Sequence, residues 1–386
     1  MEPSPVRRLA YLDALRGVAA YYVVIYHVAL FPQPNLKTPE WATSWVHFGG
    51  SGVTLFFIVS AFSLCLTMPR HLNSGVPLTS FFVHRFFRIA PLFYLWLFLS
   101  FVRDYYTTGL FQPWTEVVAG IFFVFNLLPQ YAGIYVWAGW TVGVEMLFYA
   151  IFPLLYFRCY TLSKQVAAAA FFSFIYSCFV VLAPYWIDEA FIKSYVEWLT
   201  VLRHLPIFAV GLIAFRLVQS LDVSSHRNLG LILLAICLVA IPALIGGRNP
   251  GILSWYEWQG ITFGCLLLGS ALAPLRLIVN TTTIFFGKIS YSLYLNHSTV
   301  IFFLQPVYSH IYATRWGTSL KFLLAVVLTT AIVVPLSYLS YLVIEVPGMR
   351  IGQRLVNWFQ RRAGRTTRTS GDPLQPGAVR SVRSPD

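Results

Sequence analysis

Residues 12–27 read LDALRGVAAYYVVIYH, a run apolar enough to enter a lipid bilayer although it carries Arg16 and His27. Both side chains are costly in hydrocarbon, so an ionisable group at membrane depth is by default a functional feature. Eleven residues of helix span about 16 Å, roughly three turns, which places both side chains on one face. The stretch therefore predicts a membrane helix with one polar group toward each end.

The whole chain has the composition of a polytopic membrane protein. Of its 386 residues, 58% are hydrophobic, 17% are aromatic and only 11% are charged, whereas a soluble domain carries about 25% charged residues. The composition therefore excludes a soluble globular protein, and no cleavable signal peptide is expected at the start. The windows of a bilayer's width without Asp, Glu, Lys or Arg are 47–67, 165–187, 229–247, 258–275 and 322–344.

The distribution of basic residues predicts the topology. Arg7 and Arg8 favour a cytoplasmic N-terminus, and the arginines after Gly348 favour a cytoplasmic C-terminus, so the number of crossings should be even. The short apolar piece 114–128 is then expected to be re-entrant or interfacial, although the sequence alone does not decide whether it spans. The ten expected spans are 12–31, 47–67, 81–101, 138–157, 165–187, 199–219, 229–247, 258–279, 284–304 and 322–344.

We therefore predict an all-α fold, a polytopic membrane helix bundle of about ten transmembrane helices plus that short segment, in the plasma (inner) membrane. Residues 1–348 are expected to form the transmembrane domain, with no large soluble domain appended. Residues 349–386 are predicted to be a basic cytoplasmic tail, largely disordered, because 359–386 have lost apolar periodicity. The net charge of +13 is attributed to topology and to the anionic inner leaflet, not to nucleic acid. The five cysteines have no metal-ligand spacing.

Ionisable residues inside the expected spans form a gradient across the bilayer. Arg85 and Arg88 are i,i+3 neighbours near the cytoplasmic surface, whereas Glu145 and His297 lie in the outer half with the histidine of the first span. Guanidinium groups bind phosphate well. The pattern suits a phosphate-bearing ligand that enters from the cytoplasm and carries its reactive end to an acid–base cluster, and a cavity linking the two levels is expected.

Simpler interpretations of the same residues stay open. His27 alone is as well explained by a hydrogen bond to a neighbouring helix, and Arg85 and Arg88 alone are better explained as snorkelling residues that set topology. Glu145 is harder to explain structurally, because a carboxylate at depth is by default functional. The histidines expected to be structural are His47, His71, His84, His204, His226 and His310.

Several stretches, in order over roughly residues 9–347, resemble the membrane acyltransferase 3 family of sugar and small-molecule O-acyltransferases. The chain departs from the family at Ala61, where glycine is common, and at Met146, where many members have a second glutamate. The stretches that carry the resemblance are YLDALRGVAAYYVVIYH, GGSGVTLFFIVSAFSL, FFVHRFFRIAPLFY, GWTVGVEMLFYAIFP, GKISYSLYLNH and IEVPGMR.

The resemblance implies a membrane O-acyltransferase, expected to be an O-acetyltransferase, that uses acetyl-CoA or another short acyl-CoA and no metal. It implies that His27 is the essential catalytic residue. We expect His27 to act as the general base and Glu145 to orient it as the carboxylate does in hydrolase triads. The residues expected to handle the donor are Arg16, Arg85 and Arg88, and those expected to contact the acceptor are His297, Tyr149, Tyr294 and Trp140. The expected partners are acyl-CoA, a glycan or glycosylated small molecule as acceptor, and membrane lipids, with no nucleic acid.

Two other classes of function compete with this interpretation. A proton-coupled secondary transporter or flippase would use His27, Glu145 and His297 as a proton relay. It predicts substrate movement across sealed vesicles without acyl-CoA, whereas an enzyme predicts thiol release from acyl-CoA. A scaffold or receptor without catalysis gives no reason for ionisable groups at graded depth.

Overall fold

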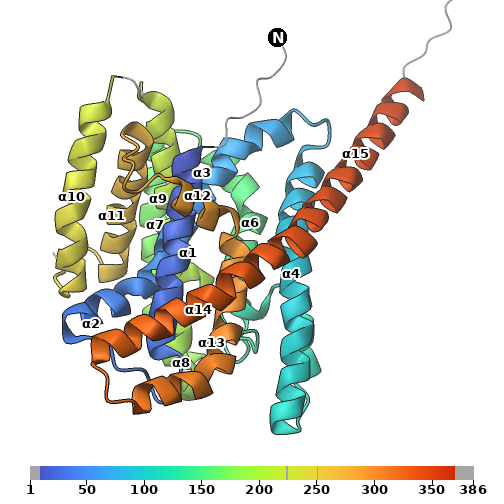
Figure 1. Ribbon diagram of the computed structural model, residues 1–386. Helices are drawn as coiled ribbons and strands as arrows, with labels where there is room; N and C mark the ends of the chain where they lie inside the picture. Colours follow the sequence, from blue (N-terminus) through green and yellow to red (C-terminus); the bar gives the residue numbers. More distant parts are fainter. Residues whose placement is uncertain (1–8, 223–224, 250, 370–386) are drawn as a thin grey trace, which may run out of the picture.

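The computed structural model describes residues 9–222, 225–249 and 251–369, with side chains as far as residue 363. Every regular element in these ranges is helical, as predicted. The short helices are α2 (Glu40–His47), α5 (Trp114–Ile121), α8 (Glu189–Ser194) and α12 (Thr281–Lys288). The long helices (Figure 1) are α1 (Ala10–Leu30), α3 (Gly52–Leu72), α4 (Pro77–Thr108), α6 (Trp140–Arg158), α7 (Leu162–Leu182), α9 (Val201–Ser220), α10 (Arg227–Ile245), α11 (Trp255–Leu272), α13 (Ser290–Ala313), α14 (Thr318–Ser340) and α15 (Val346–Thr369).

The described helices are those of a multi-pass membrane protein. Seven helical stretches among them are long and apolar enough to cross a bilayer. The predicted count of ten is not confirmed, because α1, α11 and α13, which overlap three expected spans, lie outside those seven. The predicted short segment 114–128 contains α5 and a turn of 3₁₀ helix, Phe125–Leu127. The eight residues of α5 cover only about 12 Å, less than the thickness of the hydrocarbon core.

The prediction of disorder is wrong for residues 349–369, which form helix α15. This helix continues α14 through a π-helical turn, Tyr341–Glu345, and the two run as one long rod across the molecule (Figure 1). Gly348, Gly352 and Val356 are buried at intervals of four residues, which is the spacing of a helix face that packs on a neighbour. The remainder of the predicted tail, 370–386, and the N-terminal Arg7 and Arg8 lie outside the described residues.

Helix α1 occupies the middle of the bundle. It packs against α3, α12 and α13, while α10 and α11 pair on one flank and α4 with α15 on the other (Figure 1). Added Cβ atoms on Gly17 and Gly287 would lie 2.2 Å from the Thr283 carbonyl oxygen and 1.9 Å from the Asp13 carbonyl oxygen. The backbones of α1 and α12 therefore touch directly, as small residues allow in membrane helices. Since α13 begins two residues after α12, this contact places α13 beside α1.

Candidate active site

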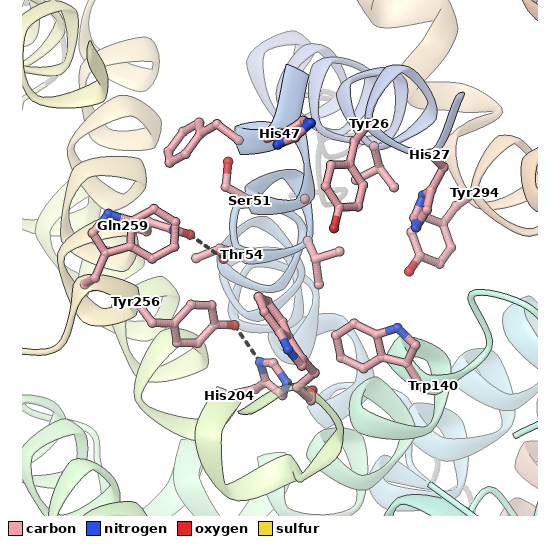
Figure 2. A pocket seen from close by; sticks show the side chains of 16 residues that line it. Tyr26, His27, His47, Ser51, Thr54, Trp140, His204, Tyr256, Gln259 and Tyr294 are labelled. Atoms are coloured by element: carbon pink, nitrogen blue, oxygen red, sulfur yellow. Dashed lines mark hydrogen bonds between the residues drawn. The ribbon is translucent and has the colours of Figure 1, made fainter. Parts of the chain in front are cut away.

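A cavity of about 310 Å³ lies between the C-terminal part of α1 and the N-terminal ends of α3, α6, α9 and α11 (Figure 2). We call it the His27 cavity. None of the described residues that line it carries a carboxylate, an ammonium or a guanidinium group. Its walls are aromatic rings, hydroxyls and imidazoles, and they include Tyr26, His27, Trp140, His204, Tyr256 and Tyr294.

His27 is paired with the second predicted histidine, His297 of α13. Nδ1 of His27 lies 2.9 Å from Nε2 of His297. Nδ1 of His297 lies 2.5 Å from the carbonyl oxygen of Tyr294. A carbonyl oxygen can only accept, so His297 carries its proton on Nδ1 and, in the neutral ring, its Nε2 accepts the proton of His27 Nδ1. This assignment leaves Nε2 of His27 unprotonated, which is the form that a general base requires.

His297 contacts His27 from the side that faces away from the cavity. It is fully buried and does not line the His27 cavity, whereas His27 and Tyr294 do. Its Nε2 also lies 3.2 Å from the Ser298 hydroxyl. The structure therefore places His27 and His297 in hydrogen-bond contact. His27 lines the cavity, whereas His297 lies behind it and fixes the orientation of the His27 ring.

A second cavity, of about 420 Å³, lies at the N-terminal end of α1. We call it the arginine cavity. Arg16 donates to the Ser63 hydroxyl over 2.6 Å and lies 3.5 Å from the Asp13 carboxylate. The acidic side chains at the cavity are Asp13 and Glu345, against five basic ones, Arg16, Arg70, Arg85, Arg88 and Lys288. The three predicted arginines thus gather in one cavity with an excess of positive charge.

The guanidinium group of Arg85 contacts side chains of two helices, α3 and α6. Its Nη2 donates to the Thr67 hydroxyl over 2.7 Å, and its guanidinium carbon lies 5.8 Å from the centre of the Tyr149 ring. Its Nε is buried without a hydrogen-bond partner among the described residues. An unpaired buried N–H is costly, so this group is a candidate donor to a bound anion.

Glu145 lies between the two levels but does not contact His27. In the described part of the chain its carboxylate accepts hydrogen bonds from the Ser60 and Tyr149 hydroxyls. The expected orientation of His27 by Glu145 is therefore corrected, because His297 takes that position. Tyr149, expected to contact the acceptor, lines neither the His27 cavity nor the arginine cavity and belongs to this Glu145 cluster.

The His27 cavity and the arginine cavity share no described lining residue. A cavity of about 20 Å³, large enough for a single water, adjoins Glu145 and shares Val53 and Tyr294 with the His27 cavity. It shares no described lining residue with the arginine cavity. The Glu145 cluster therefore lies on the expected route between the two cavities.

Sequence reasoning missed part of the His27 cavity. His47 and His204, expected to be structural, both line it. Nε2 of His204 lies 2.8 Å from the Trp198 carbonyl oxygen, and Nδ1 lies 2.5 Å from the Tyr256 hydroxyl (Figure 2). By the same rule for carbonyls, His204 accepts from Tyr256. The only signal in the sequence was that both histidines stand at the outer ends of expected spans.

Comparisons with known proteins identify a family and several relatives. A family model described as an acyltransferase domain matches residues 9–338. The O-acetyltransferase OatA of Staphylococcus aureus is 24% identical over 394 residues, covering 94% of this chain and 61% of that protein. The protein ORF330 of Acidianus two-tailed virus is 25% identical over 290 residues, covering 73% of this chain and 80% of that protein.

No solved structure matches this chain. The chain spans less than two thirds of the length of the staphylococcal relative OatA. The family match nevertheless includes every residue placed above in the His27 cavity and the Glu145 cluster, together with the arginines of the second cavity. With that match over most of its helix bundle, the chain belongs to the acyltransferase 3 family.

Proposed function

We propose that this protein is a membrane O-acyltransferase that transfers an acyl group, expected to be acetyl, from acyl-CoA to a hydroxyl group of a glycan or glycosylated small molecule. The observation that carries the proposal is the His27–His297 pair at the edge of the His27 cavity. The relative OatA, by its name an O-acetyltransferase, supports the type of reaction.

The arginine cavity is the proposed entry for the donor. Its five basic side chains outnumber its two acidic ones, and arginine binds phosphate groups in a bidentate manner. The donor's phosphates would bind there and its acyl arm would extend along α1 toward His27. On the way, the arm would pass the Glu145 cluster, which adjoins the small cavity next to the His27 cavity.

The chemistry at His27 follows from its hydrogen bonds. Nε2 of His27 takes the proton of the acceptor hydroxyl while the hydroxyl oxygen attacks the thioester carbonyl carbon. A carbon–oxygen bond forms and the carbon–sulfur bond breaks, so the sulfur leaves as a thiolate and recovers the proton from the imidazolium. His297 accepts from Nδ1 of His27 throughout and stabilises the protonated ring. The products are an O-acyl ester and free CoA.

The aromatic walls of the His27 cavity suit a sugar-bearing acceptor. The rings of Tyr26, Trp140 and Tyr294 line the same cavity as His27 (Figure 2), and aromatic rings offer apolar surface on which the apolar face of a sugar can pack. The Tyr256 hydroxyl donates to His204, so its oxygen is left to accept a hydrogen bond from the acceptor.

The test is incubation of the purified protein with labelled acetyl-CoA and candidate acceptors, followed by thiol measurement and mass analysis of the products. We expect thiol release together with an acetylated acceptor, and neither with His27→Ala. The matched control is His310→Ala, because His310 is exposed on the same helix as His297 and lines neither cavity. Substrate movement across sealed vesicles without acyl-CoA, and no thiol release, would support the transporter alternative instead.

A further inference from the structure

A third cavity, of about 460 Å³, lies beside the arginine cavity under helix α15. We call it the α15 cavity. It shares Arg70, Arg85 and Arg88 with the arginine cavity, so the same guanidinium groups face both spaces. None of the described residues that line it is acidic. An anionic ligand that fills the arginine cavity can therefore extend into this one without leaving the basic surface.

Helix α15 is held against α4 by close backbone contact. Added Cβ atoms on Gly348 and Gly352 would lie 2.8 Å from the Phe87 carbonyl oxygen and 2.9 Å from the Phe87 Cβ. Two glycines four residues apart let membrane helices approach in this way. Figure 1 shows α15 crossing α4 and running on past the bundle. This docking places Gln353 and Gln360 over the cavity. They lie about one and about three helical turns after Gly348.

The walls of the α15 cavity present rings and amides beside the arginines. The His71 and His84 rings are 5.3 Å apart. Nε2 of His84 lies 3.0 Å from the Gln353 side-chain oxygen. The Gln360 amide donates to the Ser74 carbonyl oxygen over 2.9 Å and ties α15 to the turn between α3 and α4. Flat rings, amide groups and positive charge together are what a phosphorylated nucleoside needs for recognition.

We propose that the α15 cavity binds the 3′-phosphorylated adenosine end of the acyl-CoA donor, with α15 as the wall that recognises it. This inference rests on the proposed function. The pyrophosphate would then lie at the shared arginines and the acyl arm would leave through the arginine cavity toward His27. The family match ends at residue 338, before α15 begins, so this wall belongs to the part of the chain that the match does not cover.

The first experiment needs no turnover. Binding of adenosine 3′,5′-bisphosphate to the purified full chain is measured by calorimetry for the unmodified protein and for His84→Ala and Gln353→Ala, which line only the α15 cavity. We expect binding to the unmodified chain and a loss of at least tenfold in each variant, because each removes a side chain that lines the cavity and a hydrogen bond to a charged group is among the stronger ones. The controls are His310→Ala and Arg354→Ala, both exposed and outside the cavities, in which affinity stays unchanged.

The second experiment compares two donors that differ only in the adenosine end, acetyl-CoA and acetyl-phosphopantetheine. We expect a kcat/KM at least tenfold higher for acetyl-CoA, a smaller ratio in Gln353→Ala, and the unmodified ratio in the exposed control Arg354→Ala. Equal kcat/KM values for both donors, or no binding of the bisphosphate, would overturn the inference while leaving the acyltransferase proposal intact. If neither donor is turned over, the proposed function fails, and the calorimetry still decides whether the α15 cavity binds a phosphorylated nucleoside.

Discussion

The two ends of helix α1 carry opposite chemistry. At its C-terminal end, the described walls of the His27 cavity are uncharged apart from what its imidazoles can take up. At its N-terminal end, the arginine cavity gathers five basic side chains. One helix therefore separates a place suited to proton transfer from a place suited to phosphate.

The difference shows how a membrane protein can combine two tasks that interfere with each other. A cluster of arginines next to His27 would attract anions and oppose protonation of the imidazole during catalysis. About 16 Å of helix between Arg16 and His27, together with the Glu145 cluster, keeps the two environments apart. The predictions below test this division, beginning with the largest expected effect.

Replacement of the base should have the largest effect. His27→Ala is expected to lower kcat by about 10²–10⁴-fold, the usual contribution of a positioned base, with the affinity for acetyl-CoA unchanged because the proposed phosphate site is the arginine cavity, which His27 does not line. Steady-state kinetics and donor binding on the same preparation measure both quantities. Full activity in this variant would remove His27 from the mechanism.

Replacement of His297, which is hydrogen-bonded to His27, should have the second-largest effect on kcat. His297→Ala removes the acceptor of the His27 Nδ1–H and is expected to lower kcat by about 10²-fold, the lower end of the same range. His297→Gln, whose amide oxygen can accept that proton, should recover part of the rate. The positioning role would be refuted if the alanine and glutamine variants were equally impaired.

At the other end of α1, the expected effect is on binding and not on rate. Arg85→Ala should raise the KM for acetyl-CoA about tenfold and leave kcat nearly unchanged, because a lost hydrogen bond to a charged group costs about 1.5–3 kcal/mol. Arg276→Ala, an exposed arginine outside both cavities, is the charge-matched control. An unchanged KM for acetyl-CoA in Arg85→Ala would show that Arg85 does not bind the donor, and would favour the alternative that it only sets membrane topology.

The smallest effect on activity is expected in the layer between the cavities. Glu145→Gln replaces an acceptor of two hydroxyl protons by a group that also donates, so it should lower stability by about 1–3 kcal/mol and kcat by only a few fold. Thermal unfolding in detergent and kinetics measure the two effects. An activity loss as large as that of His27→Ala, with unchanged unfolding, would place Glu145 in the catalytic machinery.

Local sequence was sufficient for the helices and for the identity of the main polar residues. Hydropathy identifies apolar helices because lipid requires every backbone group to be paired within its own helix. Arg16, Arg85 and Arg88 were expected at one level and do share a cavity. His27 and His297 were expected in one half of the bilayer and form a pair.

Other features depend on contacts that no local pattern records. Residues 349–369 were expected to belong to a largely disordered tail, because apolar periodicity is lost toward the end of the chain, yet they form helix α15, which two glycines dock on α4. His204 became part of a cavity wall only because α9 packs against α3 and α11. Glu145 was assigned to His27, but its partners are Ser60 and Tyr149.

The sequence by itself determined that this protein is a helical membrane protein with imidazoles and guanidinium groups at different depths. The reason is that each ionisable side chain within an apolar span is costly in lipid and can be identified from the sequence one residue at a time. The tertiary structure alone decided which of those groups touch. Between helices in lipid, the choice of neighbour depends on close packing of small residues such as Gly17 and Gly287. That packing is a property of two surfaces together, and neither helix carries it in its own sequence.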